Sequence, residues 1–97
     1  MIKVFDITKN FAIDSDVGEV VHNKVSDAMK ENEKVVLDFE NVDIILSVFL
    51  NSVISGFYNN NKGIEFENKV QILNLSPSAK ILWDRVVASV KRKSKTN

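Results

Sequence analysis

Three aspartates stand where carboxylates could do chemistry, in or beside segments predicted to be strands. Asp6 lies near the end of the first such segment, Asp38 lies inside the second, and Asp43 follows it. Carboxylates at strand ends could accept a phosphoryl group, but that chemistry would need a second acid beside Asp6 and a lysine closing the strand at Lys69–Leu75. The sequence provides neither. We therefore expect Asp38 to be a buried carboxylate that accepts hydrogen bonds from backbone amides or a helix N-terminus, and Asp43 to lie in a loop before a helix.

The other reactive side chains predict no active site. His22 lies at the edge of an apolar stripe in a chain without cysteine or a second histidine, so we expect a partly buried structural histidine. No serine has the G-x-S-x-G context of a hydrolase nucleophile, and Gly56 and Gly63 form no phosphate-binding loop. The sequence therefore predicts a protein that is not an enzyme and has no cofactor and no metal.

The strands and helices that position these side chains are predicted to alternate along the chain. Apolar alternation predicts strands, and apolar residues at helical spacing predict helices. The expected order is a strand at Ile2–Ile7 with Phe11–Ile13 continuing or pairing with it, a helix capped by Asp14, Ser15 or Asp16 and ending near Glu31–Glu33, a strand at Val35–Phe39 buried on both faces, a helix at Ser47–Tyr58, a turn at Asn59–Gly63, a strand at Lys69–Leu75, and a helix begun by Ser76 and Pro77. This order predicts an α/β fold with one mostly parallel or mixed sheet of roughly three to five strands, packed by about three helices.

The helix predicted at Ser47–Tyr58 has no charged side chain, although charged residues make up 27% of the sequence. Six apolar residues fall on one stripe that we expect to be buried: Leu46, Phe49, Leu50, Val53, Ile54 and Phe57. The opposite face costs little to desolvate, which predicts a contact surface. The candidate binding residues are those of this face and one in the preceding loop: Ser47, Val48, Asn51, Ser52, Ser55 and Asp43. The alternative is a codon bias that favours Asn, Ile and Ser at indifferent positions.

The formal net charge of zero conceals an uneven distribution. Residues 1–90 contain nine basic and thirteen acidic side chains, a net charge of −4, and the remaining four basic side chains lie in residues 91–97. An acidic surface is a poor site for nucleic acid or an anionic membrane. We expect one domain at residues 1–90 and a basic, disordered tail at 91–97. The first residues lack a signal-peptide pattern and there is no cysteine, which predicts a cytoplasmic protein.

One segment reads Val35-Val36-Leu37-Asp38-Phe39, and a second follows it as Ile44-Ile45-Leu46-Ser47-Val48-Phe49. Together they resemble the STAS-like family of small bacterial proteins. These are distant relatives of the STAS domains of anti-sigma-factor antagonists. The strand Lys69–Leu75 with Asn74, followed by a helix, is similar to the family's I-x-L-x-N pattern. The resemblance covers Lys34 to Val90. By this resemblance Ser47 matches the serine that antagonists present to a serine kinase, whereas Leu46 stands where they have Asp. Ser47 is therefore either a phosphorylation site or only the cap of its helix.

The resemblance implies a regulatory protein-interaction module that binds its partner through the start of the helix Ser47–Tyr58. The partner would be a histidine-kinase-like ATPase or an anti-sigma-type regulator. Two other functions stay open. The loop Asp43–Ser47 and the helix N-terminus could hold a nucleotide or another anion, or the same face could close a homodimer, with pairing of an exposed sheet edge as another route to self-association.

Overall fold

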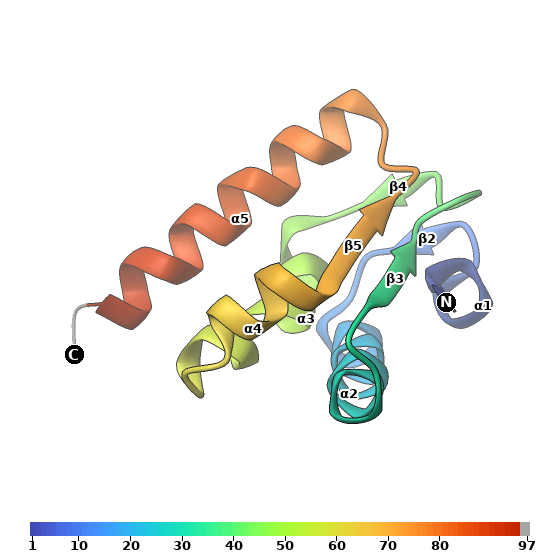
Figure 1. Cartoon of the computed structure of the whole chain (residues 1–97). Coiled ribbons are helices and arrows are strands. Elements are labelled where there is room, and N and C mark those ends of the chain that lie inside the picture. The colour runs from blue at the N-terminus through green and yellow to red at the C-terminus, as the bar shows by residue number, and fades with distance from the viewer. Residues whose placement is uncertain (96–97) are drawn as a thin grey trace.

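The computed structural model describes residues 1–95 as five helices and five strands (Figure 1). The elements are β1 (Ile2–Lys3), α1 (Val4–Thr8), β2 (Phe11–Ala12), α2 (Ser15–Glu31), β3 (Val35–Asp38), β4 (Ile44–Ile45), α3 (Ser47–Asn59), α4 (Gly63–Lys69), β5 (Val70–Leu73) and α5 (Pro77–Lys95). The three long helices and the strands β3 and β5 lie where the sequence pattern predicted them.

The strands form two small sheets. One sheet has the order β1-β3-β5 and the other consists of β2 and β4, and every pair in them is parallel. The prediction of a mostly parallel α/β fold is therefore confirmed. The strands are divided between two sheets because β2 pairs with β4, and not with β1 as we expected.

The first strand is shorter than predicted, because Val4–Thr8 forms helix α1. Val4 is fully buried, and Ile7 packs against the same core. A strand directs residues three positions apart to opposite faces, whereas a helical turn brings them to one side. The core contact of both residues therefore explains why the strand ends at Lys3.

Helix α4 is an element that the sequence pattern did not predict. Its apolar residues Ile64 and Phe66 are two positions apart, so they show no helical spacing. Phe66 is buried, and its ring stacks on Phe57 and on Trp83 with centroid distances of 4.6 Å and 6.2 Å. The burial of this aromatic ring stabilises the helix against the core.

Helix starts follow the predicted capping residues. The Asp14 side chain accepts a hydrogen bond from the Val17 N–H at 2.9 Å, and α2 begins at the next residue, Ser15. The Ser76 hydroxyl accepts one from the Ala79 N–H at 3.2 Å, and Pro77 is the first residue of α5. Both side chains satisfy backbone donors that a helix leaves without a partner.

Helices α2 and α3 pack closely against each other at Gly18. A Cβ atom on Gly18 would lie 2.6 Å from the Phe49 carbonyl oxygen and 2.7 Å from the Ser52 Cβ atom, so only glycine fits here without a shift. One turn further along α2, His22 donates a hydrogen bond from Nδ1 to the Val53 carbonyl at 2.8 Å. The expectation of a partly buried structural histidine is confirmed.

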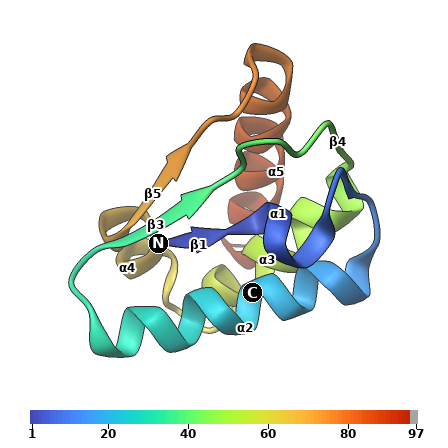
Figure 2. The same ribbon diagram turned by 90° about the vertical axis from the view of Figure 1, so that its right-hand side faces the viewer.

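The predicted double burial of β3 is confirmed only in part: Val35 and Leu37 are buried on one face, and Asp38 is buried on the other. Leu37 is fully buried, but Val36, which points to the opposite face, is half-buried. Its neighbours on that face include the exposed residues Lys3 and Gln71. Figure 2 shows α2 running below the three strands of the sheet.

The C-terminal segment is helical up to Lys95, where we expected a disordered tail from residue 91. Lys91 forms an ion pair with Glu67 of α4 at 2.9 Å, and its ammonium lies 5.9 Å from the Tyr58 ring centroid. The Tyr58 hydroxyl donates to the same Glu67 carboxylate at 2.6 Å. This cluster fastens α5 to α3 and α4, so the tail prediction fails for Lys91–Lys95, and residues 96–97 lie outside the described residues.

Candidate interaction site

The predicted binding residues on α3 fall into two groups. Ser47, Val48 and Asn51 are exposed, whereas Ser52 and Ser55 are half-buried. The uncharged face is therefore not one continuous free surface.

Ser52 and Ser55 face helix α2. Ser52 lies at the contact with Gly18, and Ser55 lines a hollow together with Glu19 and His22 of α2. At Ser52 a longer charged side chain would not fit, because the two helices approach closely there. The lack of charge at Ser52 thus has a structural reason, and neither Ser52 nor Ser55 is the freely exposed position that we expected.

Ser47 does not cap its helix. The residue at the cap position is Leu46, which has no side-chain hydrogen bond to the helix, and Ser47 is the first helical residue. The Leu46 carbonyl accepts hydrogen bonds from the Phe49 and Leu50 N–H groups at 3.1 Å and 3.2 Å. The hydroxyl of Ser47 is thus at an exposed residue in the first turn of α3 and makes no capping hydrogen bond.

The two aspartates of this region have structural partners. Asp43 is exposed, and its carboxylate accepts a hydrogen bond from the Asn10 side chain at 2.8 Å. Strand β4 separates it from α3, so it lies further from the helix N-terminus than we expected. Asp38 is 6% exposed and accepts hydrogen bonds from the Asn74 side chain at 2.8 Å and from the Glu40 N–H at 2.9 Å. These two bonds lower the pKa of Asp38, and the expectation of a buried, hydrogen-bonded carboxylate is confirmed.

The hydrogen bond between Asn74 and Asp38 joins the C-terminal ends of β3 and β5. Asn74 has a left-handed backbone conformation with φ of 62°, which Asn tolerates better than most residues. The Phe39 N–H donates to the Leu73 carbonyl at 2.9 Å beside them. This arrangement fixes the start of the loop that leads from β3 to β4.

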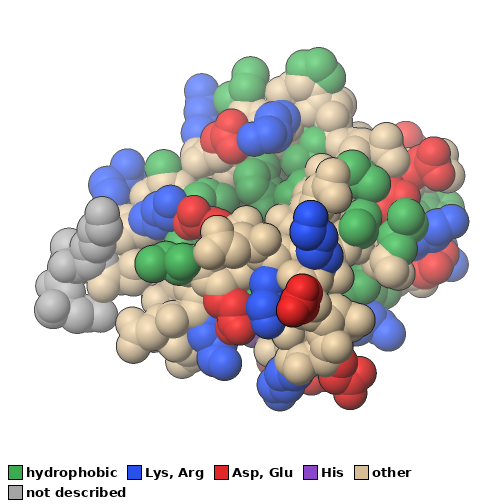
Figure 3. Space-filling view, viewed as in Figure 1, with side chains coloured by type: hydrophobic (Ala, Val, Ile, Leu, Met, Phe, Trp, Pro, Cys, Tyr) green, Lys and Arg blue, Asp and Glu red, His purple; other side chains and the backbone are tan. Residues whose placement is uncertain are grey.

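The outer face of the β2–β4 sheet is apolar and open to solvent. Phe11 pairs with Ile44, and the next outward-facing positions are Ile13 and Leu46. These four side chains are 54%, 47%, 44% and 46% exposed in that order, and Val48 in the first turn of α3 is 49% exposed. We call these five residues the apolar end of the molecule, and Figure 3 shows hydrophobic side chains at the surface where β2 and β4 lie.

Sequence reasoning missed the apolar end. We placed Leu46 on the buried stripe of α3, but Leu46 precedes the helix, and strand alternation directs its side chain outward. The signal was present in two short segments, Phe11-Ala12-Ile13 and Ile44-Ile45-Leu46. In each, the middle residue faces the core, and the outer two face solvent.

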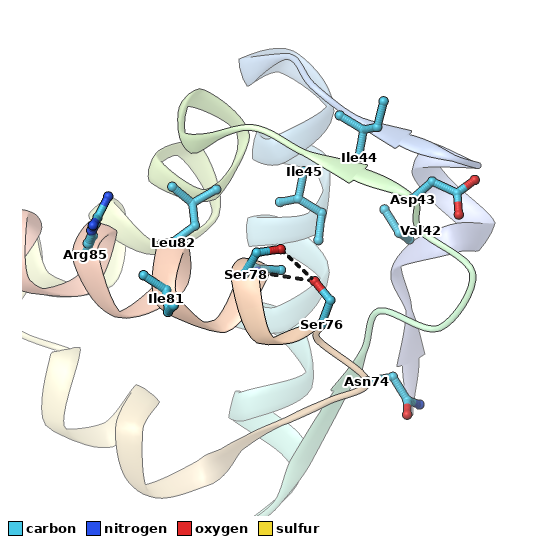
Figure 4. A pocket seen from close by; sticks show the side chains of 11 residues that line it. Val42, Asp43, Ile44, Ile45, Asn74, Ser76, Ser78, Ile81, Leu82 and Arg85 are labelled. Carbon is cyan, nitrogen blue, oxygen red and sulfur yellow. Dashed lines mark hydrogen bonds between the residues drawn. The ribbon is translucent and has the colours of Figure 1, made fainter.

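Two adjoining hollows border this end along helix α5. The first, of about 420 Å³, lies between the segment 42–45 and the start of α5 (Figure 4). The second, of about 440 Å³, lies between the start of α3 and the middle of α5. Leu82 and Arg85 line both hollows, so the two adjoin along this helix, and we call them together the groove along α5.

Two other kinds of site are absent from the described part of the chain. Residues 1–95 contain no group of three or more His, Asp or Glu side chains that could hold a metal ion. None of the helices in this range is long and apolar enough to cross a membrane.

Comparison with known protein families matches residues 17–80 to the STAS-like domain of unknown function. Neither the comparison with curated proteins nor that with solved structures gave a match. The matched segment includes β4 and the exposed first turn of α3, whereas Phe11, Ile13 and Arg85 lie outside it. Since the match covers more than half of the 97 residues, the chain belongs to the STAS-like family.

Proposed function

We propose that this chain is a non-enzymatic regulatory module that binds a partner protein through its apolar end. The observation that carries the proposal is the clustering of five large apolar side chains, each about half exposed, on one sheet face and the adjoining helix turn. Contiguous apolar surface of this kind is typical of interaction sites. Covering the exposed half of each side chain would contribute on the order of 1 kcal/mol to binding.

The surroundings of the apolar end suit a protein interface. Ser47, Asn51 and Asp43 are exposed polar residues next to or within one helical turn of its members, and they provide part of a polar rim. Protein interfaces commonly have an apolar centre and a polar rim. The sequence predicted a partner contact at the start of α3, its uncharged face and the preceding loop. The present proposal keeps the first turn of α3 and adds β2 and β4.

The family relationship supports a partner of the kind that related antagonists bind, a histidine-kinase-like ATPase or an anti-sigma-type regulator. Ser47 stands at the position of the serine that those antagonists present to a kinase. A phosphate there would add about −1.5 to −2 charges at pH 7 between the side chains of Leu46 and Val48. Burying that charge in an apolar contact is unfavourable, so phosphorylation of Ser47 would release the partner.

The test compares Ile44→Glu with Ile64→Glu as the matched control. Ile64 is also an exposed isoleucine, 78% accessible, but it lies on α4 and outside the apolar end. The wild-type chain and both variants are tagged, and proteins that bind them in lysate of the native host are identified and then re-tested as purified proteins. A partner that binds wild type and Ile64→Glu but not Ile44→Glu supports the proposal. Equal binding to all three chains contradicts it.

Two further measurements on the same chains test the two alternative functions. Light scattering on the isolated chain detects a homodimer, and loss of the dimer only in Ile44→Glu would make the apolar end a self-association surface. Native mass spectrometry of the freshly purified chain detects a retained nucleotide or other anion. A bound anion, with no protein partner, would favour the ligand-binding alternative at the loop Asp43–Ser47 and the N-terminus of α3.

A further inference from the structure

The groove along α5 has the length of a short extended peptide. Its α5 side follows one face of the helix from Ser78 to Ser89, which spans roughly 16 Å at 1.5 Å per residue. The opposite wall is formed by segment 42–45 and then by the first turns of α3. A strand rises about 3.3 Å per residue, so an extended segment of about five residues would fill this length.

One edge of β4 is available for pairing beside this groove. The N–H groups of Ile44 and Leu46 donate to carbonyls on the β2 side, Asn10 at 3.1 Å and Ala12 at 3.0 Å. Successive residues of a strand direct their backbone groups to alternate sides, so the N–H and C=O of Ile45 point away from β2. Ile45 lines the first hollow and no β2 residue does, which places this edge of β4 at the groove.

A cation without a partner lies in the middle of the groove. Within residues 1–95, Arg85 forms no hydrogen bond and no ion pair. Its neighbours three and four positions away on α5 are uncharged, and the one acid of this helix, Asp84, is bonded to Lys80 at 2.7 Å. The guanidinium of arginine matches a carboxylate with two parallel hydrogen bonds, so an unpaired arginine in a groove suits an acidic group on the occupant.

We propose that the groove binds an extended acidic segment of the partner protein. The segment adds to the free edge of β4 as a third parallel or antiparallel strand, with its main chain bonded to Ile45. An apolar side chain packs on Leu82, and a carboxylate of the segment pairs with Arg85. Addition of a peptide strand to an exposed sheet edge is a common mode of recognition. This inference rests on the proposed function, because it names the part of the partner that the module recognises.

The test uses a displayed library of random eight-residue peptides selected on three purified chains. These are the wild type, Arg85→Glu, and Arg92→Glu as the matched control. Arg92 is an exposed arginine on the same helix, two turns further along, and lines neither hollow. The best wild-type peptide is then synthesised with its acid intact, with the acid changed to glutamine, and with the acid changed to lysine. Binding is measured by fluorescence anisotropy, and amide hydrogen exchange of Ile45 is followed by NMR.

We expect wild type and Arg92→Glu to select peptides that alternate apolar and polar residues around an acid, and Arg85→Glu not to select them. The acid-to-glutamine peptide should bind about tenfold more weakly, and the Ile45 amide should become protected from exchange when the acidic peptide binds. Inorganic phosphate at millimolar concentration should not displace the peptide.

Other results overturn the inference. The inference fails if no peptide is selected or if all three chains select the same peptides. It also fails if hydrogen exchange of the Ile45 amide does not change on peptide binding, or if phosphate alone displaces the peptide. If these occur while a partner still needs Ile44 for binding, the proposed function stands and only the groove assignment fails. If neither the groove nor the apolar end binds anything, the proposed function fails as well.

Discussion

The two halves of the uncharged face of α3 have the same composition but different surroundings. The half with Ser52 and Ser55 packs against α2 at Gly18, where two helix backbones nearly touch. The half with Ser47, Val48 and Asn51 is open to solvent and adjoins the apolar end. Small uncharged residues on a helix can therefore result from close packing or from selection for a contact surface. Substitutions distinguish the two, because under the proposed function those in the first half should change folding stability and those in the second should change association.

The largest effect is expected from Gly18→Leu. The new side chain would occupy the space of the Phe49 carbonyl and the Ser52 side chain, and α2 would have to move away from α3. Overpacking of this kind costs about 3 kcal/mol of unfolding free energy. Urea unfolding followed by circular dichroism measures the loss, with Val48→Leu in the open half as the control that should change it little. Equal stability of the two variants would show that the helices do not need their close approach.

A somewhat smaller effect is expected from Asp38→Ala, which removes the anchor of the loop leading to the apolar end. Asp38 accepts two hydrogen bonds, and the loss of both should lower the free energy of unfolding by about 2 kcal/mol at neutral pH. The folded-state pKa of Asp38 is lowered, so its contribution is present above the ordinary aspartate value of 3.8 and is lost as pH falls through the folded-state pKa.

Unfolding of wild type and Asp38→Ala from pH 7 down to pH 2 measures this dependence. The stability difference between the two should begin to shrink near pH 4, where the carboxylate of the unfolded chain becomes protonated, and should disappear below the lowered folded-state pKa. Asp6→Ala, at an exposed position without a hydrogen-bond partner in the described residues, is the control and should follow wild type throughout. A difference that stays constant with pH would mean that the charge of Asp38 is not what stabilises the loop.

A pair of glutamate substitutions compares the two halves directly. Ser52→Glu places a carboxylate at the α2 contact, which should cost about 1–3 kcal/mol of stability. Asn51→Glu lies one residue away at an exposed position and should change stability by no more than about 0.5 kcal/mol, while weakening the partner complex. Thermal melts and calorimetry with the captured partner are the measurements. If Ser52→Glu melts like wild type, the first half is not a packed contact.

The sequence predicts the helices well because their apolar residues repeat over many turns. Phe49, Leu50, Val53, Ile54 and Phe57 are all buried, and Asp14 and Ser76 cap the helices that they precede. The same periodicity misassigned Leu46, because one residue before a helix start has strand geometry that a helical repeat does not represent.

The features that make up the candidate site depend on contacts between distant parts of the chain. Phe11 and Ile44 meet only because β2 and β4 pair, and the two strands are each two residues long, too short for a periodic signal. Gly18 gives no local sign of its contact with Ser52. Arg85 likewise becomes notable only when Ile45 is placed across the groove from it. Such placements require the tertiary fold.

The smallest effect on stability is expected at Ser47, and it separates the remaining interpretations of this residue. A capping serine changed to alanine would cost about 1 kcal/mol, but Leu46 occupies the cap position, so Ser47→Ala should stay within about 0.5 kcal/mol of wild type. Ser47→Asp places a negative charge in the first turn, where the helix dipole should raise stability by about 0.3–1 kcal/mol. Urea unfolding of both variants decides between these values.

Under the proposed function Ser47→Asp nevertheless weakens the partner complex, because its charge must be desolvated beside Leu46 and Val48, whereas Ser47→Ala leaves binding unchanged. If Ser47→Asp binds the partner as tightly as Ser47→Ala does, a phosphate at this serine cannot control the interaction through its charge, and the contact surface lies beyond the first turn of α3.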